Sequence, residues 1–185
     1  MSSRLARREH EGNNVGGAAV RLFESLQYPV GAGGLDVAAE VIRRRRYGVI
    51  EAMDGRLAAV HFRPWPKLVS LPEALLLGNW YHDRRTADRC RLYFNQPWRF
   101  RNFLAVPYAV CGRGTRLATM NAALAALDEI ARIKQTDALL ADVMNFRISP
   151  RVLARYGWVA HNPSRWHRHY IKRFYGEYAG LRASG

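Results

Sequence analysis

Mostly apolar residues with a tendency to form β-strands fill two neighbouring segments, 47–53 and 56–62. Asp54 and Gly55 lie between them, and this dipeptide is typical of a two-residue hairpin turn. The pattern therefore predicts an antiparallel β-hairpin near the middle of the N-terminal half.

Helical periodicity flanks this hairpin. An amphipathic stretch at 18–26 predicts a short helix inside a segment interrupted by glycines. Asp36 is a suitable N-cap for a second helix that ends near Arg45. Pro72 fits the first turn of a third helix at 71–83.

The second half of the chain alternates between strand and helix signals. In the segment 115–134, apolar residues recur at helical spacing. Gly157 ends the shorter helix that follows it. In order, the pattern predicts a strand at 100–106, a loop at 107–114, a helix at 115–134, a strand at 138–144, a helix opened by Ser149 and Pro150, and a β-prone tail at 158–175.

This order predicts an α/β (α+β) chain with a mixed, mostly antiparallel central sheet flanked by helices. We expect three parts: a basic, Gly-rich N-terminal arm at 1–33, one folded domain at 34–178, and a flexible tail at 179–185. The 185 residues are 49% hydrophobic and 24% charged, which suits one domain with its own core.

Charge and cysteine content bear on partners and location. The net charge is +14, and basic residues gather near 43–46, 84–101 and 165–173, so we expect an attraction to polyanions, including nucleic acid. The sequence shows neither an apolar run of membrane-spanning length nor a secretory signal, and we expect a cytoplasmic protein. The two cysteines, Cys90 and Cys111, are expected to be reduced thiols.

A glycine-rich turn joins the predicted strand at 100–106 to the long helix. Backbone N–H groups and the positive end of the helix dipole meet at such a junction, which favours phosphate. The turn is no Walker loop, because Gly-Lys-Ser/Thr is missing. A dinucleotide fingerprint fits poorly as well, since its third glycine would fall at Leu117.

The junction resembles the acyl-CoA site of the GNAT superfamily of N-acyltransferases, in which a strand and a proline lead to Arg/Gln-x-x-Gly-x-Gly/Ala and an amphipathic helix. The matching residues are Leu104-Ala105-Val106-Pro107 and Cys111-Gly112-Arg113-Gly114. Downstream, the strand at 139–143, Asn145, the helix at 150–156 and Gly157-Trp158 follow the family's order, so the resemblance covers 100–160.

The resemblance implies transfer of an acyl group, with acetyl-CoA or another acyl-CoA as co-substrate, to an amine acceptor. The CoA pyrophosphate would rest on backbone N–H groups near Arg113 to Leu117, and the pantetheine arm would lie between two splayed strands. The implied cofactor-binding residues are Leu104, Ala105, Val106, Cys111, Gly112, Arg113, Gly114, Thr115, Arg116, Leu117 and Asn145.

The chain departs from the family pattern at residues that matter. Cys111 stands where Arg or Gln is usual, and Arg116 replaces the last Gly or Ala. Leu153 occupies the position at which many members carry a tyrosine general acid, while Tyr156 lies nearby but would face inward. These departures leave the acid unassigned.

An amine must lose a proton before it attacks, so a base is needed. Its candidates in the sequence are Glu51, His61 and Asp142. Together with Tyr156 they form the expected catalytic set.

Two other functions stay open at this stage: a non-catalytic GNAT-like CoA-binding protein, and a basic RNA- or DNA-binding module. His161, His167 and His169 invite a metal interpretation, but no third ligand type has supporting spacing, so we expect no metal. A monomer and a homodimer are both compatible with the sequence, which does not identify the acceptor.

Overall fold

A computed structural model describes residues 24–27, 34–66, 87–142, 149–161 and 169–178 of the chain. Its centre is an eight-stranded sheet in the order β1-β3-β2-β4-β5-β6-β8-β7. The strands are β1 (Glu24–Gln27), β2 (Tyr47–Met53), β3 (Arg56–Arg63), β4 (Arg89–Asn95), β5 (Phe103–Cys111), β6 (Ala138–Asp142), β7 (Val159–Ala160) and β8 (His169–Arg173).

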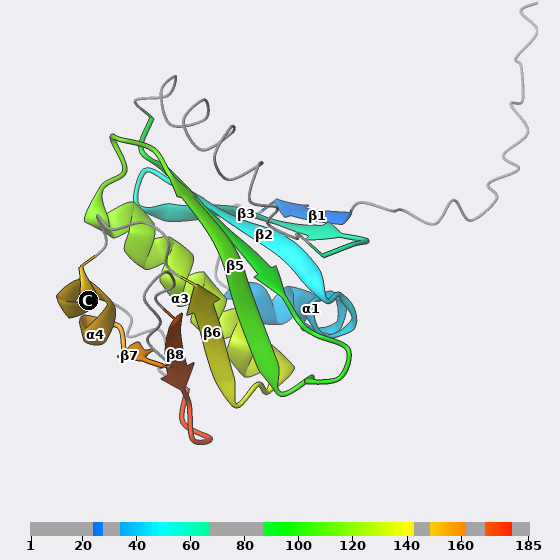
Figure 1. The fold of residues 1–185 in the computed structure, drawn as a ribbon. Coiled ribbons are helices and arrows are strands. Elements are labelled where there is room, and N and C mark those ends of the chain that lie inside the picture. Colours follow the sequence, from blue (N-terminus) through cyan, green and yellow to red (C-terminus); the bar gives the residue numbers. More distant parts are fainter. Residues whose placement is uncertain (1–23, 28–33, 67–86, 143–148, 162–168, 179–185) are drawn as a thin grey trace, which may run out of the picture.

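Helices pack on this sheet (Figure 1). A 3-10 turn, η1 (Gly34–Ala38), leads into α1 (Ala39–Arg44). The long helix α3 (Leu117–Lys134) connects β5 to β6 and contacts β2, β3 and β4, while α1 packs against α3. The short helix α4 (Pro150–Arg155) adjoins β7.

The core fills the space between α3 and one face of the sheet. Strand alternation directs every second residue to that face, as in Ile50, Val60 and Leu92, which are buried there. From α3, Leu127 and Ile130 meet them and are fully buried. The residues in between point to the opposite face, which carries the charged side chains described below.

The predicted fold class is confirmed. Only β5 and β6 pair in parallel, through the α3 crossover, and the other pairs in the described sheet are antiparallel. The predicted hairpin is β2–β3, and Asp54 and Gly55 have positive φ (50° and 78°) as such a turn requires. Its turn rests on α3, since the Gly55 N–H donates to Thr119 Oγ1.

Three local predictions were wrong. Residues 24–26 belong to strand β1 rather than a helix, because they extend the edge of β3. Asp36 does not cap α1; it lies within η1 and its carboxylate pairs with Arg132, while Ala38 takes the N-cap position. The strand expected to end at Val106 continues as β5 to Cys111, pairing with β4.

The two helices predicted in the C-terminal half are confirmed. The helix predicted at 115–134 is α3, which starts two residues later because Arg116 is extended (ψ 157°). Ser149 caps α4 as expected by accepting from the Val152 N–H, and Gly157 follows it with φ 79°. The helix expected at 71–83 lies outside the described residues.

Among the helices that the structure describes, none is both long and apolar enough to cross a bilayer.

We predict that Gly48→Ala destabilises the fold by roughly 1–3 kcal/mol, because it overpacks a filled core. The added Cβ would lie 2.5 Å from Cζ of Phe94 and 2.9 Å from the carbonyl oxygen of His61. Phe94 is fully buried and cannot move aside. Urea unfolding measures the loss. Gly34→Ala is the control: its Cβ would meet nothing within 4 Å, although φ +54° carries its own strain. A loss below about 0.5 kcal/mol in Gly48→Ala, the size of an ordinary surface substitution, would refute the steric explanation.

Candidate functional site

Strand β5 changes partners along its length. It pairs with β6 from Phe103 to Val106 and with β4 as far as Cys111. The β4–β5 register slips between Tyr93 and Asn95, so that Val106 and Pro107 together oppose a single β4 residue, which is a β-bulge. Proline has no N–H to give to a ladder and is tolerated at such a bulge. The last β5–β6 pair joins Val106 to Ala141, and in the described sheet β6 ends at the next residue, Asp142.

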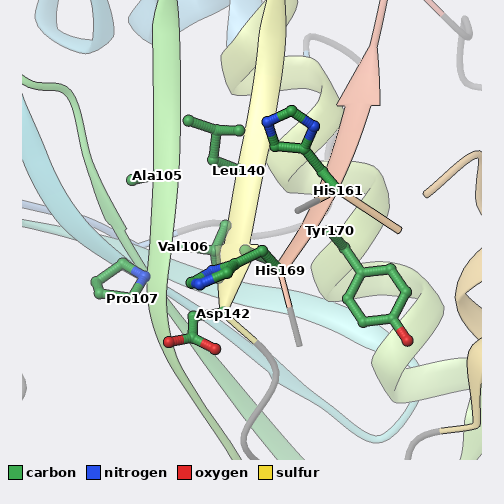
Figure 2. A pocket seen from close by; sticks show the side chains of 9 residues that line it. Ala105, Val106, Pro107, Leu140, Asp142, His161, His169 and Tyr170 are labelled. Atoms are coloured by element: carbon green, nitrogen blue, oxygen red, sulfur yellow. The ribbon is translucent and has the colours of Figure 1, made fainter. Parts of the chain in front are cut away.

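A pocket of about 340 Å³ lies where the β5–β6 pairing stops (Figure 2). Its lining comes from β5, β6, β8 and the end of β7: Ala105, Val106, Pro107, Leu140, Ala141, Asp142, His161, His169 and Tyr170. Most of these groups are apolar. The polar side chains therefore define what chemistry the pocket can support.

Asp142, His169 and His161 form a row across three adjacent chain segments. Asp142 pairs with His169 in the β6–β8 register, which places their Cβ atoms about 4.5–5.5 Å apart. The His161 N–H donates to the His169 carbonyl at 2.8 Å, so these residues are neighbours too. Figure 2 shows all three reaching the pocket, while the ring of Tyr170 points away from them. Imidazole and carboxylate side chains are both of the kinds that serve as general bases.

The glycine turn lies at the other end of β5. The Gly112 N–H donates to the Arg89 carbonyl at 3.2 Å, and Thr115 Oγ1 donates to the same carbonyl at 2.7 Å. Gly112 and Gly114 do not adopt a positive φ, so backbone conformation does not demand glycine here. Arg113 and Gly114 are exposed, and Leu117 at the first turn of α3 is 58% exposed.

A carboxylate of the chain already sits at the start of α3. Asp88 Oδ1 accepts the Arg116 N–H at 2.8 Å, and Oδ2 accepts from Arg116 Nε at 2.7 Å. The hydrogen bond from Thr119 and those from Arg116 hold the pKa of Asp88 below its usual range. Arg116 also lies 3.8 Å from Asp54. The side chain of Arg116, one of the implied cofactor-binding residues, is therefore engaged with two carboxylates.

Glu51 and His61, two of the candidate bases, lie together on the sheet face opposite α3. The Glu51 carboxylate is 3.4 Å from His61 Nε2, 3.4 Å from Arg91 Nε, and also contacts Arg89. Burial pushes the pKa of Glu51 up, but Arg91, Arg89 and His61 outweigh it and the pKa is lowered. A carboxylate with a lowered pKa that is held by two arginines and a histidine ring is a weak base.

This cluster is remote from the pocket. Glu51 belongs to β2, and Asp142 to β6, which lies three strands away in the sheet order. At the ordinary spacing between strands, that separation is at least roughly 14 Å. The structure thus places Asp142 in the pocket and leaves Glu51 and His61 outside it.

The candidate acids do not reach the pocket lining. Tyr156, at the C-terminus of α4, donates its hydroxyl to Asn121 of α3. Leu153, at the position of the family's tyrosine, is 8% exposed and belongs to the core. Asn145 lies outside the described residues.

The remaining predicted cofactor residues divide between the two ends of β5. Leu104, Ala105 and Val106 pair with β6, and Cys111 through Leu117 form the glycine turn and the start of α3. Sequence reasoning missed His169 as a pocket residue. Its alternation with His167 was visible, but only the β6–β8 register brings it opposite Asp142.

The basic residues near 43–46 make contacts within the fold. Arg43 Nε donates to the Ile133 carbonyl, Arg44 pairs with Glu40 at 2.7 Å, and Arg46 stacks 3.7 Å from the Trp98 ring. Within the part of the chain that the structure describes, no group of three His, Cys, Asp or Glu side chains is arranged to hold a metal.

Comparisons with known proteins add little. No family model and no curated protein matches the chain. Among solved structures, a chain described as nourseothricin acetyltransferase matches 82% of this chain and 98% of its own, with 13% identity and a TM-score of 0.35. At that TM-score the likeness carries no weight in the proposals below.

We predict that Glu51→Gln lowers the free energy of unfolding by about 2–4 kcal/mol at neutral pH, because Arg89 and Arg91 lose the charge that compensates them. Since the pKa of Glu51 is lowered in the folded chain, this contribution is complete above its ordinary value of 4.5 and is lost as the pH falls through the folded value.

Urea unfolding of both proteins at neutral pH and below pH 4.5 measures the difference. His61→Gln is the control and should cost less, because the ring is partly exposed and two arginines still hold Glu51. A stability gap that does not narrow in acid would contradict the ionic account.

Proposed function

We propose that the chain is an N-acyltransferase that moves an acyl group, most simply acetyl, from acyl-CoA to an amine. One observation carries the proposal: within the residues that the structure describes, β5 extends five residues beyond its last pair with β6, between a pocket at one end and a glycine turn at the other. An extended polar ligand fits along such an edge, with its anionic end on the turn.

The backbone of β5 supports this arrangement. Gly112 donates to β4, and alternation along the strand therefore directs the amide groups of Ala109 and Cys111 away from β4. These groups are positioned to pair with the amides of a pantetheine arm. From Ala105 to Cys111 the strand covers roughly 20 Å, over which the arm would run.

The pyrophosphate would lie on the exposed side of the turn, over Arg113, Gly114 and Leu117. Glycine allows close approach of a phosphate to the backbone, and the dipole of α3 adds positive potential. Asp88 holds the buried side of the same helix start, so its negative charge opposes the ligand.

For the chemical step we propose His169 as the base, with Asp142 orienting its ring. His169 takes a proton from the attacking amine, the C–N bond forms, and the C–S bond breaks to release the CoA thiolate. Thiolates leave readily, since a thiol pKa is about 8.5. This is compatible with a core leucine at position 153, where the family often has an acid. The acceptor would enter the pocket from the sheet face opposite α3.

Acetyl-CoA should raise the melting temperature of the purified chain, because a ligand bound only by the folded state adds about 2.7 kcal/mol at 100 times Kd. Gly114→Asp should abolish the rise by adding a negative charge on the phosphate side. Asp88→Asn should enlarge it by removing one from the same helix start, even though its own baseline melting temperature falls.

Free CoA and pantetheine separate the two halves of this site: CoA should reproduce the rise and pantetheine, which lacks the diphosphate, should not. An unchanged melting curve at millimolar acetyl-CoA would refute the proposed function. Equal shifts in wild type, Gly114→Asp and Asp88→Asn would place the ligand elsewhere.

His169→Gln should lower kcat for acyl transfer by about 10²–10⁴-fold without weakening acetyl-CoA binding, as expected for loss of a general base. Free CoA released from acetyl-CoA with a panel of amines measures turnover. His61→Gln, a matched change outside the pocket, should keep at least half of the rate. Binding of acetyl-CoA with no turnover in any variant would instead indicate a non-catalytic CoA-binding protein.

A further inference from the structure

The chain's two cysteines face each other across two neighbouring strands. Cys90 near the start of β4 and Cys111 at the end of β5 are direct partners in the register. Their Sγ atoms are 3.1 Å apart, and both thiols are reduced. Neither thiol takes part in the acyl transfer proposed above, which uses only the backbone of Cys111, so the contact between the sulfurs needs its own explanation.

The backbone around this pair suits a disulfide. The Gly112 N–H bonds to the Arg89 carbonyl, which makes that pair hydrogen-bonded and the next one, Cys90 with Cys111, non-hydrogen-bonded. Cα atoms in such a pair are about 4.5 Å apart, within the range of about 4.4–6.8 Å that disulfides span. Rotation of the side chains alone has to bring the sulfurs about 1 Å closer to reach bonding distance.

The two thiols differ in access and ionisation. Cys90 is fully buried, whereas Cys111 is partly exposed beside the exposed residues Arg113 and Gly114. The hydrogen bond between them raises the pKa of Cys90, with burial adding to the rise. The same hydrogen bond lowers the pKa of Cys111 against the effect of burial. Cys111 is thus the thiol that a dissolved oxidant meets first, and Cys90 is placed to resolve it.

We propose that Cys90 and Cys111 form a reversible disulfide when the protein meets a peroxide. The Cys111 thiolate attacks one peroxide oxygen and becomes a sulfenic acid, while the other oxygen leaves as water after protonation. Cys90 sulfur then attacks Cys111 sulfur, the S–O bond breaks, and a second water leaves. Overall, two thiols are oxidised to one disulfide, and hydrogen peroxide is reduced to two waters. A dithiol reductant reverses the reaction.

The bond would fasten the glycine turn to β4. Arg89, next to Cys90, accepts both the Gly112 N–H and the Thr115 hydroxyl, and Asp88 accepts the Arg116 N–H. A disulfide between Cys90 and Cys111 would lie directly beside the hydrogen bond between Arg89 and Gly112. The oxidised form therefore holds the entrance to α3 more firmly than the reduced form does.

Stoichiometric hydrogen peroxide, added to the reduced full-length protein and then quenched, tests the proposal. Under denaturing, non-reducing conditions the intact mass should fall by two hydrogen atoms, and no thiol should react with maleimide. Trypsin should yield the dipeptide Cys90-Arg91 joined to 102–113. The melting temperature should rise by about 5 °C, since a crosslink restricts the unfolded chain, and return after dithiothreitol.

Two single variants separate the roles of the thiols. Cys90→Ala should leave Cys111 as a sulfenic acid that dimedone captures, without a change in melting temperature. Cys111→Ala should leave the Cys90 thiol unreacted while the protein is folded. Two maleimide-reactive thiols after treatment, disulfides only between molecules, or a sulfinic acid on Cys111 beside an intact Cys90 thiol would each overturn the proposal. None of these readouts depends on CoA binding.

Discussion

The organisation of the molecule depends on one constraint: β5 must pair with a long antiparallel neighbour, β4, and a short parallel neighbour, β6. The β5–β6 pairing ends at the bulge formed by Val106 and Pro107, whereas the β4–β5 pairing continues beyond it. Before it, both edges of β5 are used; after it, only the β4 edge is used in the described sheet. The pocket lies at this point, and the glycine turn lies at the end of the strand. Both parts of the proposed site are thus consequences of unequal strand pairing.

Local signals allowed the sequence to predict the β2–β3 hairpin, α3 and α4, because Asp54-Gly55, helical spacing and Ser149-Pro150 act within a few residues. Long-range pairing was not predictable in the same way. Strand β1 pairs with the free edge of β3. Strand β5 continues past Pro107 because β4 pairs with it beyond the bulge. Likewise, Asp142 could be proposed from its position, but its partner His169 follows only from the β6–β8 register.

Two acidic residues lie among arginines of a chain whose net charge is +14. Glu51 neutralises Arg89 and Arg91 on one sheet face, and Asp88 neutralises Arg116 at the start of α3. These carboxylates serve as internal counterions, with lowered pKa values in both cases. That role conflicts with general-base catalysis, because the interactions that stabilise the carboxylate also reduce its proton affinity. A base for the proposed acyl transfer would therefore come from residues that the cationic network does not hold.

Position along β5 also relates the cysteine pair to the acyl-transfer site. Cys111 is the last residue of the strand whose outward edge would hold the pantetheine arm, and its backbone points to that edge while its side chain meets Cys90 on the core side. Oxidation can therefore act on the side chain without removing the backbone groups that a ligand would use. Its effect on a cofactor would come through the geometry of the turn after Gly112, where Arg89 already holds two donors. A thiol pair beside the proposed phosphate-binding turn would thus give one strand two separable chemistries, one on its edge and one on its face.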